Sequence, residues 1–185
     1  MKKTALLVID VQKGLDDPVW GKRNNPDAES NIALLISAWR KRKFPVIHIR
    51  HCSVEPDSPL HPELPGNAFK EEAQPLPEEK QFTKTVNSAF IGTDLEDYLR
   101  KHDISDLVVV GLTTDHCVST SVRMAANLGF DVTLISDATA TFERKGHDGT
   151  CYSADEIHQV NLASLNGEFC NVRSTGEVLQ KIGSP

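Results

Sequence analysis

The stretch VVVGLTTDHCVSTSVRMAANLGF, residues 108–130, decides the fold of this chain. Its apolar start, together with Leu107, is typical of a strand that is buried on both faces. A short polar turn follows the strand. Residues 117–128 then read as a helix with Gly129 as its C-cap. The stretch therefore predicts a strand, a tight turn and a helix in direct succession.

Cys117 lies in the first turn of this predicted helix. A helix N-terminus carries free N–H groups and a partial positive charge, so we expect the thiol to ionise more readily than usual. A turn between a strand and a helix also holds the thiol at the edge of a sheet, where a ligand reaches it. On its own, Cys117 is only a candidate nucleophile.

Apolar runs and helix starts alternate along the rest of the chain. The predicted strands are residues 4–9, 45–49, 81–84, 107–112, 132–136 and 168–172. The predicted helix starts are Asn25 with Pro26, Cys117, and three capping boxes at Thr93 with Glu96, Ser153 with Glu156 and Ser174 with Glu177. This alternation predicts a Rossmann-like, three-layer α/β/α sandwich with a mostly parallel six-stranded sheet. We expect one domain over residues 1–185.

Residues 51–79 contain six prolines and little periodicity, which indicates a long loop. Loops of this length inside a compact domain are uncommon and usually functional. We therefore expect this segment to form a wall or a lid of a pocket.

Three chemically active residues follow three of the predicted strands. Asp10 follows the first strand, Lys84 ends the third, and Cys117 lies just beyond the fourth. Ligands of open α/β sheets bind at the carboxyl ends of the strands, so we expect the three side chains to converge. A carboxylate, an ammonium and a thiol together are able to carry out acyl transfer, with the carboxylate moving the proton.

Composition excludes several classes of partner. The formal net charge of −6 and the absence of a basic run argue against nucleic acid. No apolar run is long enough to cross a membrane or to act as a secretory signal. The four cysteines show no CxxC pairing, which favours neither a zinc cluster nor a disulfide framework. We expect a cytoplasmic protein whose partner is a small molecule.

Three motifs resemble the isochorismatase-like hydrolases: ALLVIDVQKGL around Asp10, FTKTVNSAF around Lys84 and VVVGLTTDHCVSTSVRMAANLGFDVTLISDATATF around Cys117. The resemblance runs in register over residues 4–142. It implies that Asp10 is the general base, Lys84 its charge partner and Cys117 the nucleophile.

The resemblance also implies a non-proline cis peptide between Leu112 and Thr113. The backbone N–H groups of Thr113 and Cys117 would then form an oxyanion hole. The isochorismatase branch acts on an enol ether and lacks this cysteine, so Cys117 favours the amidohydrolase branch, which includes nicotinamidase and N-carbamoylsarcosine amidase. Family members form dimers or tetramers, and we expect a homodimer or a homotetramer.

No cofactor is expected. Nicotinamidases bind a metal through an Asp-x-His motif, which the corresponding stretch HIRHCSVEPDSPLHPE lacks. Metal binding through His51, Asp57 and His61 is the alternative, since loop residues are able to converge.

Five further residues are candidates for the substrate pocket: Gln12, Trp20, Arg50, Phe90 and His116. His158, within ADEIHQVNLASL, is interpreted as a packing or interface residue on a helix. Core packing is the competing interpretation for the two aromatic residues, and simple solvation for Arg50 and His116.

The sequence thus predicts a cysteine-dependent hydrolase of a small amide or carbamoyl compound, acting on a C–N bond other than a peptide bond. Three alternatives remain open: an enol-ether hydrolase that retains the cysteine, a redox or sensing thiol protein, and a binding module without turnover. The identity of the substrate is not predicted.

Overall fold

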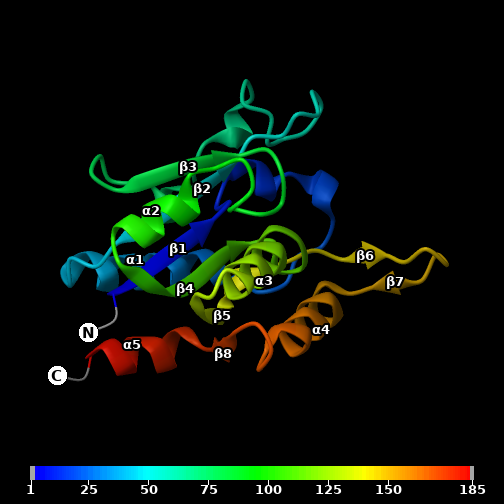
Figure 1. Cartoon of the computed structure of the whole chain (residues 1–185). Helices are drawn as coiled ribbons and strands as arrows, with labels where there is room; N and C mark the ends of the chain where they lie inside the picture. The colour runs from blue at the N-terminus through cyan, green and yellow to red at the C-terminus, as the bar shows by residue number, and fades with distance from the viewer. Residues whose placement is uncertain (1–2, 184–185) are drawn as a thin grey trace.

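A single parallel sheet forms the centre of the molecule (Figure 1). The computed structural model describes residues 3–183. Within them the sheet has the strand order β3-β2-β1-β4-β5-β8, and all neighbours are parallel. The strands are β1 (Lys3–Ile9), β2 (Val46–His51), β3 (Lys80–Lys84), β4 (Ile104–Leu112), β5 (Asp131–Ala140) and β8 (Asn171–Arg173). The expected α/β architecture is confirmed.

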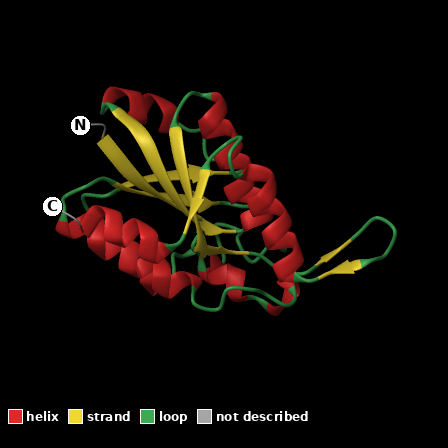
Figure 2. Ribbon diagram, turned by 90° about the horizontal axis from the view of Figure 1, so that it is seen from below, coloured by secondary structure: helices red, strands yellow, loops and turns green. Residues whose placement is uncertain are grey.

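Helices cover both faces of the sheet (Figure 2). They are α1 (Ala28–Lys41), α2 (Leu95–Lys101), α3 (Ser119–Asn127), α4 (Ala154–Leu165) and α5 (Thr175–Gly183). Leu6 and Val8 of β1 belong to the core shared with α1 and α5, whereas Leu7 and Ile9 belong to the core shared with α2, α3 and α4. Successive strand residues point to opposite faces, which is why β1 is apolar at every inner position.

Gly111 allows β4 to approach β1 closely. A Cβ atom at this position would lie 2.0 Å from the Ile9 carbonyl oxygen, and the residue has a φ of +124°. Only glycine adopts this conformation without strain and also leaves room for the neighbouring backbone. Gly111, the single glycine in VVVGL, therefore lets the end of β4 lie directly beside the end of β1. Asp10 is the next residue after that end of β1.

Two of the predicted helix N-caps, Asn25 and Thr93, are wrong. Asn25 has a φ of +43° and precedes α1, which begins at Ala28. Its side-chain amide donates to Ser136 O and Thr139 O instead of capping a helix. Thr93 makes no capping box with Glu96: its hydroxyl donates to Ala89 O and accepts from Leu95 N, and Asp94 is the N-cap of α2. The boxes at Ser153 and Ser174 are present, each with its Glu partner three residues on.

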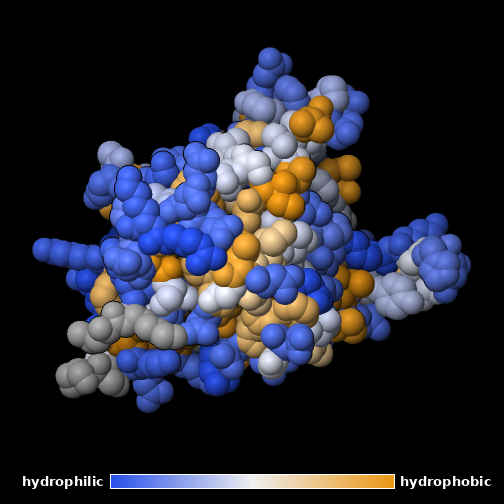
Figure 3. Space-filling view, viewed as in Figure 1, coloured by the Kyte–Doolittle hydropathy of each residue, from blue (hydrophilic) through white to orange (hydrophobic). Residues whose placement is uncertain are grey.

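The segment around Cys117 differs from the predicted continuous helix. A single π-helical turn, η5 (Thr114–Val118), carries the cysteine, and α3 begins only after it. The last strand is also shorter than predicted, at Asn171–Arg173. Moreover, an unpredicted hairpin of β6 (Arg144–Lys145) and β7 (Cys151–Tyr152) projects from the body, and its surface is mostly hydrophilic (Figures 1–3).

The predicted long loop between β2 and β3 is held in place by buried amides. Asn67 donates to Leu60 O at 2.7 Å and to His51 O at 2.9 Å, and Gln12 donates to Asn67 O at 2.9 Å. The short helices outside the sheet layers are η1 (Lys13–Asp16), η2 (Pro18–Trp20), η3 (Pro65–Asn67) and η4 (Glu71–Ala73). Among residues 3–183, no helix combines the length and the apolar character needed to cross a membrane.

Candidate active site

The side chains of Asp10, Lys84 and Cys117 meet at the carboxyl edge of the sheet. Lys84 Nζ lies 2.5 Å from Asp10 Oδ2 and 3.3 Å from Cys117 Sγ. Asp10 and Lys84 are each only 1% exposed. Asp10 follows the last residue of β1, and Lys84 is the last residue of β3, so the strand ends bring these charges together.

His51 is a fourth member of this group. The sequence analysis had proposed it only as a metal ligand. It is the last residue of β2 and pairs in register with Lys84. Its Nδ1 lies 3.1 Å from Lys84 Nζ. Burial and then the charge of Lys84 lower its pKa, and a hydrogen bond to the Val86 backbone takes the N–H of the ring. The imidazole is therefore neutral and accepts a hydrogen bond from the ammonium.

The ammonium of Lys84 has the position that a metal ion would need. Among the described residues, the side chains of Asp10, His51 and Cys117 bring potential ligand atoms within 4.8 Å of one another. Lys84 Nζ contacts all three of these atoms or groups, and an ammonium has three donors for three acceptors. Asp57 and His61 do not belong to this group. The described residues therefore do not bring the three predicted ligands, His51, Asp57 and His61, together in one group.

The thiol of Cys117 is less acidic than the sequence led us to expect. Burial raises its pKa, and the negative charge of Asp10 raises it further; Lys84 only partly opposes both effects. In addition, the cysteine lies in the middle of the π-helical turn and not at the first residue of an α-helix. The direction of this pKa shift is opposite to the expected one, so the structure does not support the expectation of a readily ionised thiol.

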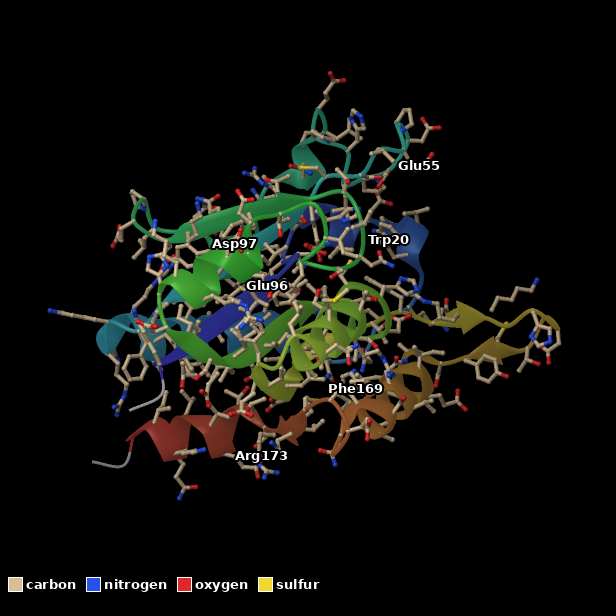
Figure 4. The ribbon with its side chains drawn as sticks, in the orientation of Figure 1. Trp20, Glu55, Glu96, Asp97, Phe169 and Arg173 are labelled. Atoms are coloured by element: carbon tan, nitrogen blue, oxygen red, sulfur yellow. The ribbon has the colours of Figure 1, made fainter. Side chains whose placement is uncertain are left out.

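A small cavity of about 120 Å³ opens onto Cys117. Trp20 and His116 line it, as the sequence predicted for both. The indole N–H of Trp20 donates to Gly14 O at 2.7 Å, and the residue lies at the end of η2 (Figure 4). The other lining residues, which the sequence analysis did not propose for the pocket, are Leu15, Leu60, Asn87, Leu112 and Arg144. Of these, Leu15, Asn87 and Leu112 lie within the three quoted motifs, so the motifs were a signal that could have indicated them.

Three other candidates do not line this cavity. The Gln12 side chain is fully buried, where it accepts from His51 N and donates to His51 O. Arg50 lies over the Phe69 ring at 5.2 Å, since successive strand residues face opposite ways. Phe90 stacks on Phe130 at 6.0 Å between ring centroids and joins the apolar core.

The turn before Cys117 has the expected unusual backbone. The Leu112–Thr113 peptide bond is cis. The Thr113 carbonyl accepts hydrogen bonds from His116 N at 3.2 Å and from Val118 N at 3.1 Å, which closes the turn. Among residues 3–183, two buried atoms of cavity-lining residues, Asp10 Oδ1 and Thr113 Oγ1, have no hydrogen-bond partner. Both are available to a polar group in the cavity.

Charged groups form the rim of the cavity. Arg144 Nε donates to Asp115 Oδ2 at 2.8 Å, and the Thr141 hydroxyl donates to Asp115 Oδ1. Although burial raises the pKa of Asp115, the bonds from Thr141 and Arg144 hold it below its usual value. The pair ties the base of the hairpin to the turn that carries Cys117. His116, beside it, has a side chain that is 57% exposed.

Known proteins resemble this chain over most of its length. The model of the isochorismatase domain matches residues 4–175. A solved structure of an isochorismatase family protein from Chromobacterium violaceum has a TM-score of 0.94 and 49% identity, over 98% of this chain and 94% of that one. YrdC, an isochorismatase family protein of Bacillus subtilis, is 48% identical over 178 residues, 96% of this chain and 95% of its own. Streptothricin hydrolase of Streptomyces noursei is 32% identical over 142 residues, 75% of this chain and 55% of the hydrolase.

Proposed function

The chain belongs to the isochorismatase family of hydrolases, and from this premise we propose that it hydrolyses a small amide or carbamoyl compound through a thioester on Cys117. The observation that carries the proposal is the contact of one buried ammonium with both the Asp10 carboxylate and the Cys117 thiol. Asp10 and Cys117 line one small cavity, and Lys84 contacts both of them; these contacts support roles as proton acceptor, nucleophile and fixed positive charge.

Acylation begins with a protonated thiol. As Cys117 Sγ attacks the carbonyl carbon, its proton passes to Asp10 Oδ1, which has no hydrogen-bond partner among the described residues. Lys84 holds the other carboxylate oxygen throughout and limits the rotation of the side chain. The negative charge that develops on the carbonyl oxygen is received by the N–H groups of Thr113 and Cys117, the proposed oxyanion hole.

The protonated Asp10 then returns its proton to the leaving nitrogen. The C–N bond breaks, and ammonia or an amine leaves the cavity while the acyl group stays on Sγ as a thioester. Water next attacks the thioester carbon and gives a proton to Asp10. The C–S bond breaks, the acid is released, and Asp10 returns the proton to the Cys117 sulfur. Each cycle consumes one water and leaves the protein unchanged.

The cavity limits the substrate to a small group. A volume of about 120 Å³ lies below the range of roughly 300–1,000 Å³ that is usual for drug-sized ligands. Leu15 and Leu60 form apolar walls, and Asp10, Thr113 and Asn87 are among the polar residues that line the cavity. A compact acyl or carbamoyl group fits these walls, and the larger part of a bigger substrate would lie at the rim.

The test is release of ammonia or amine from a panel of small amides and carbamoyl compounds, with intact-mass detection of the acyl-protein. We expect turnover and an adduct on Cys117 in the parent protein, and neither in Cys117→Ala. Full activity in Cys117→Ala would overturn the thioester mechanism. Hydrolysis of an enol ether by that variant, with no amide turned over, would instead identify the enol-ether chemistry of the family.

A further inference from the structure

His158 lies outside the cavity and has no part in the mechanism above, yet it is bonded to the turn that carries Cys117. It belongs to α4, which packs against both α3 and η5 (Figure 1). The residue is only 2% exposed. Its Nδ1 lies 2.9 Å from the hydroxyl of Thr114, the first residue of η5.

The hydrogen bonds fix the tautomer of this imidazole. A hydrogen bond to the Ser136 backbone carbonyl takes the N–H of the ring. Asn25 Nδ2, 3.4 Å from His158 Nε2, already donates to Ser136 O and Thr139 O, and so has no third proton to give. Nδ1 is then the unprotonated nitrogen, and it accepts the Thr114 hydroxyl proton.

Thr114 transmits this contact to the site. Its side chain is fully buried, and its backbone directly follows Thr113, whose carbonyl closes the turn. Thr114 O also accepts from Ser119 N at the start of α3. The residue is thus held at the side chain by α4 and at the backbone by α3, and the orientation of the Thr113 peptide depends on both.

We infer that His158 is a positioning residue for the oxyanion hole, acting through the Thr114 hydroxyl. The inference rests on the proposed function, because it assigns a consequence to the Thr113 and Cys117 N–H groups. Its chemical content is specific: the pair stabilises the tetrahedral oxyanion and has no part in the reactivity of the thiol itself. A displacement of a catalytic group by about 1 Å typically costs on the order of 10²-fold in rate.

Two reagents separate these effects. Acylation of Cys117 by p-nitrophenyl acetate passes through an oxyanion, whereas its alkylation by iodoacetamide is a direct displacement at carbon and does not. Alkylation is read at Cys117 by peptide mass spectrometry, because Cys151 is exposed and Cys52 is partly buried like Cys117. The kcat and KM for the best amide of the panel complete the measurements.

We expect Thr114→Val and His158→Leu to lower the rate of acylation and kcat by about 10- to 100-fold. KM should change less than threefold, and the rate of alkylation by iodoacetamide should stay within about twofold of the parent. The double variant should be no slower than either single variant. His158→Asn, whose Oδ1 can replace the Nδ1 acceptor, should regain much of the rate. Thr175→Val is the matched control: this buried threonine also loses a hydroxyl bond, to Asp137 Oδ1, and should leave kcat unchanged.

Parent-like acylation in folded Thr114→Val would overturn the inference, as would a parallel loss of alkylation and acylation. If the parent protein is alkylated by iodoacetamide but acylated by neither the amides nor p-nitrophenyl acetate, the proposed function itself fails. That result differs from a failure confined to His158 and Thr114, in which the parent remains active.

Discussion

At the scale of a single residue, the ammonium of Lys84 is the group that contacts all three acceptors of the site. Its ammonium has one anionic acceptor in Asp10, one neutral acceptor in His51 and one in the thiol of Cys117. A second anion in place of neutral His51 would raise the pKa of the thiol still further. The neutral imidazole satisfies the third N–H of the ammonium without that effect, which is the physical reason for a histidine at the end of β2.

A first prediction concerns the buried pair of Asp10 and Lys84. Lys84→Met leaves the Asp10 carboxylate buried without its cation, and should abolish turnover and lower the free energy of unfolding by about 3–5 kcal/mol. In Asp10→Asn/Lys84→Met the charge is gone as well, so much of the stability should return while activity stays absent. Urea denaturation measures both variants. Equal stability of the single and double variants would show that the pair is not coupled in this way.

At the scale of the element, the strands were the most predictable part of the fold. The central residues of β1 and β4 are all apolar, and such apolar runs predict a buried strand and not a loop. Helix starts were less predictable because Asn25 and Thr93 have side chains that bond to distant or preceding carbonyls. Ser153 caps its own helix, and nothing local in the sequence distinguishes it from Thr93.

A second prediction tests the close approach of β4 to β1. Gly111→Ala places a methyl group 2.0 Å from Ile9 O, against backbone that has no freedom to move away. We expect a loss of about 3 kcal/mol or more in the free energy of unfolding, and a loss of turnover because Asp10 follows Ile9.

Gly129 supplies the control for this substitution. It also has a positive φ, +87°, but a Cβ there meets nothing within 4 Å. Gly129→Ala should therefore lower the free energy of unfolding only by the cost of a positive φ in alanine, about 1 kcal/mol, and leave turnover unchanged. Thermal or urea unfolding of the two variants compares them directly. Similar losses in both would mean that conformation, and not the contact with β1, explains the glycine at 111.

At the scale of the whole molecule, the sequence located the site through its strand ends but not the contacts that hold it. Asp10, Lys84 and Cys117 were predictable because parallel strands bring their carboxyl ends to one edge. The contact of Thr114 with His158 joins η5 to a helix 44 residues further along, and Arg144 reaches Asp115 from the base of a hairpin that has no apolar signal. Such pairings follow from packing and not from local pattern.

The last prediction concerns the stability of the whole fold against pH. Burial lowers the pKa of His48, His51 and His158 below the value of about 6.5 that they have when unfolded. Below pH 6.5 the unfolded chain therefore binds more protons than the folded one. The free energy of unfolding should fall as the pH is lowered from 7 to 5, by up to about 1.4 kcal/mol per pH unit for each histidine that stays neutral in the fold.

A second decline should follow in more acidic solution. Although burial raises the pKa of Glu29, hydrogen bonds from Arg23 and Lys70 lower it to about 2, so the unfolded chain again takes up the proton first below about pH 4.5. Urea denaturation across pH 3–8 measures both stages. His158→Asn removes one of the three histidines and should reduce the slope between pH 7 and 5, whereas Glu29→Gln should reduce only the acidic decline. His147→Asn, on the exposed hairpin, should alter neither stage. A constant free energy of unfolding between pH 7 and 5 would contradict the prediction, because it would mean that the buried histidines take up protons in the fold as readily as in the unfolded chain.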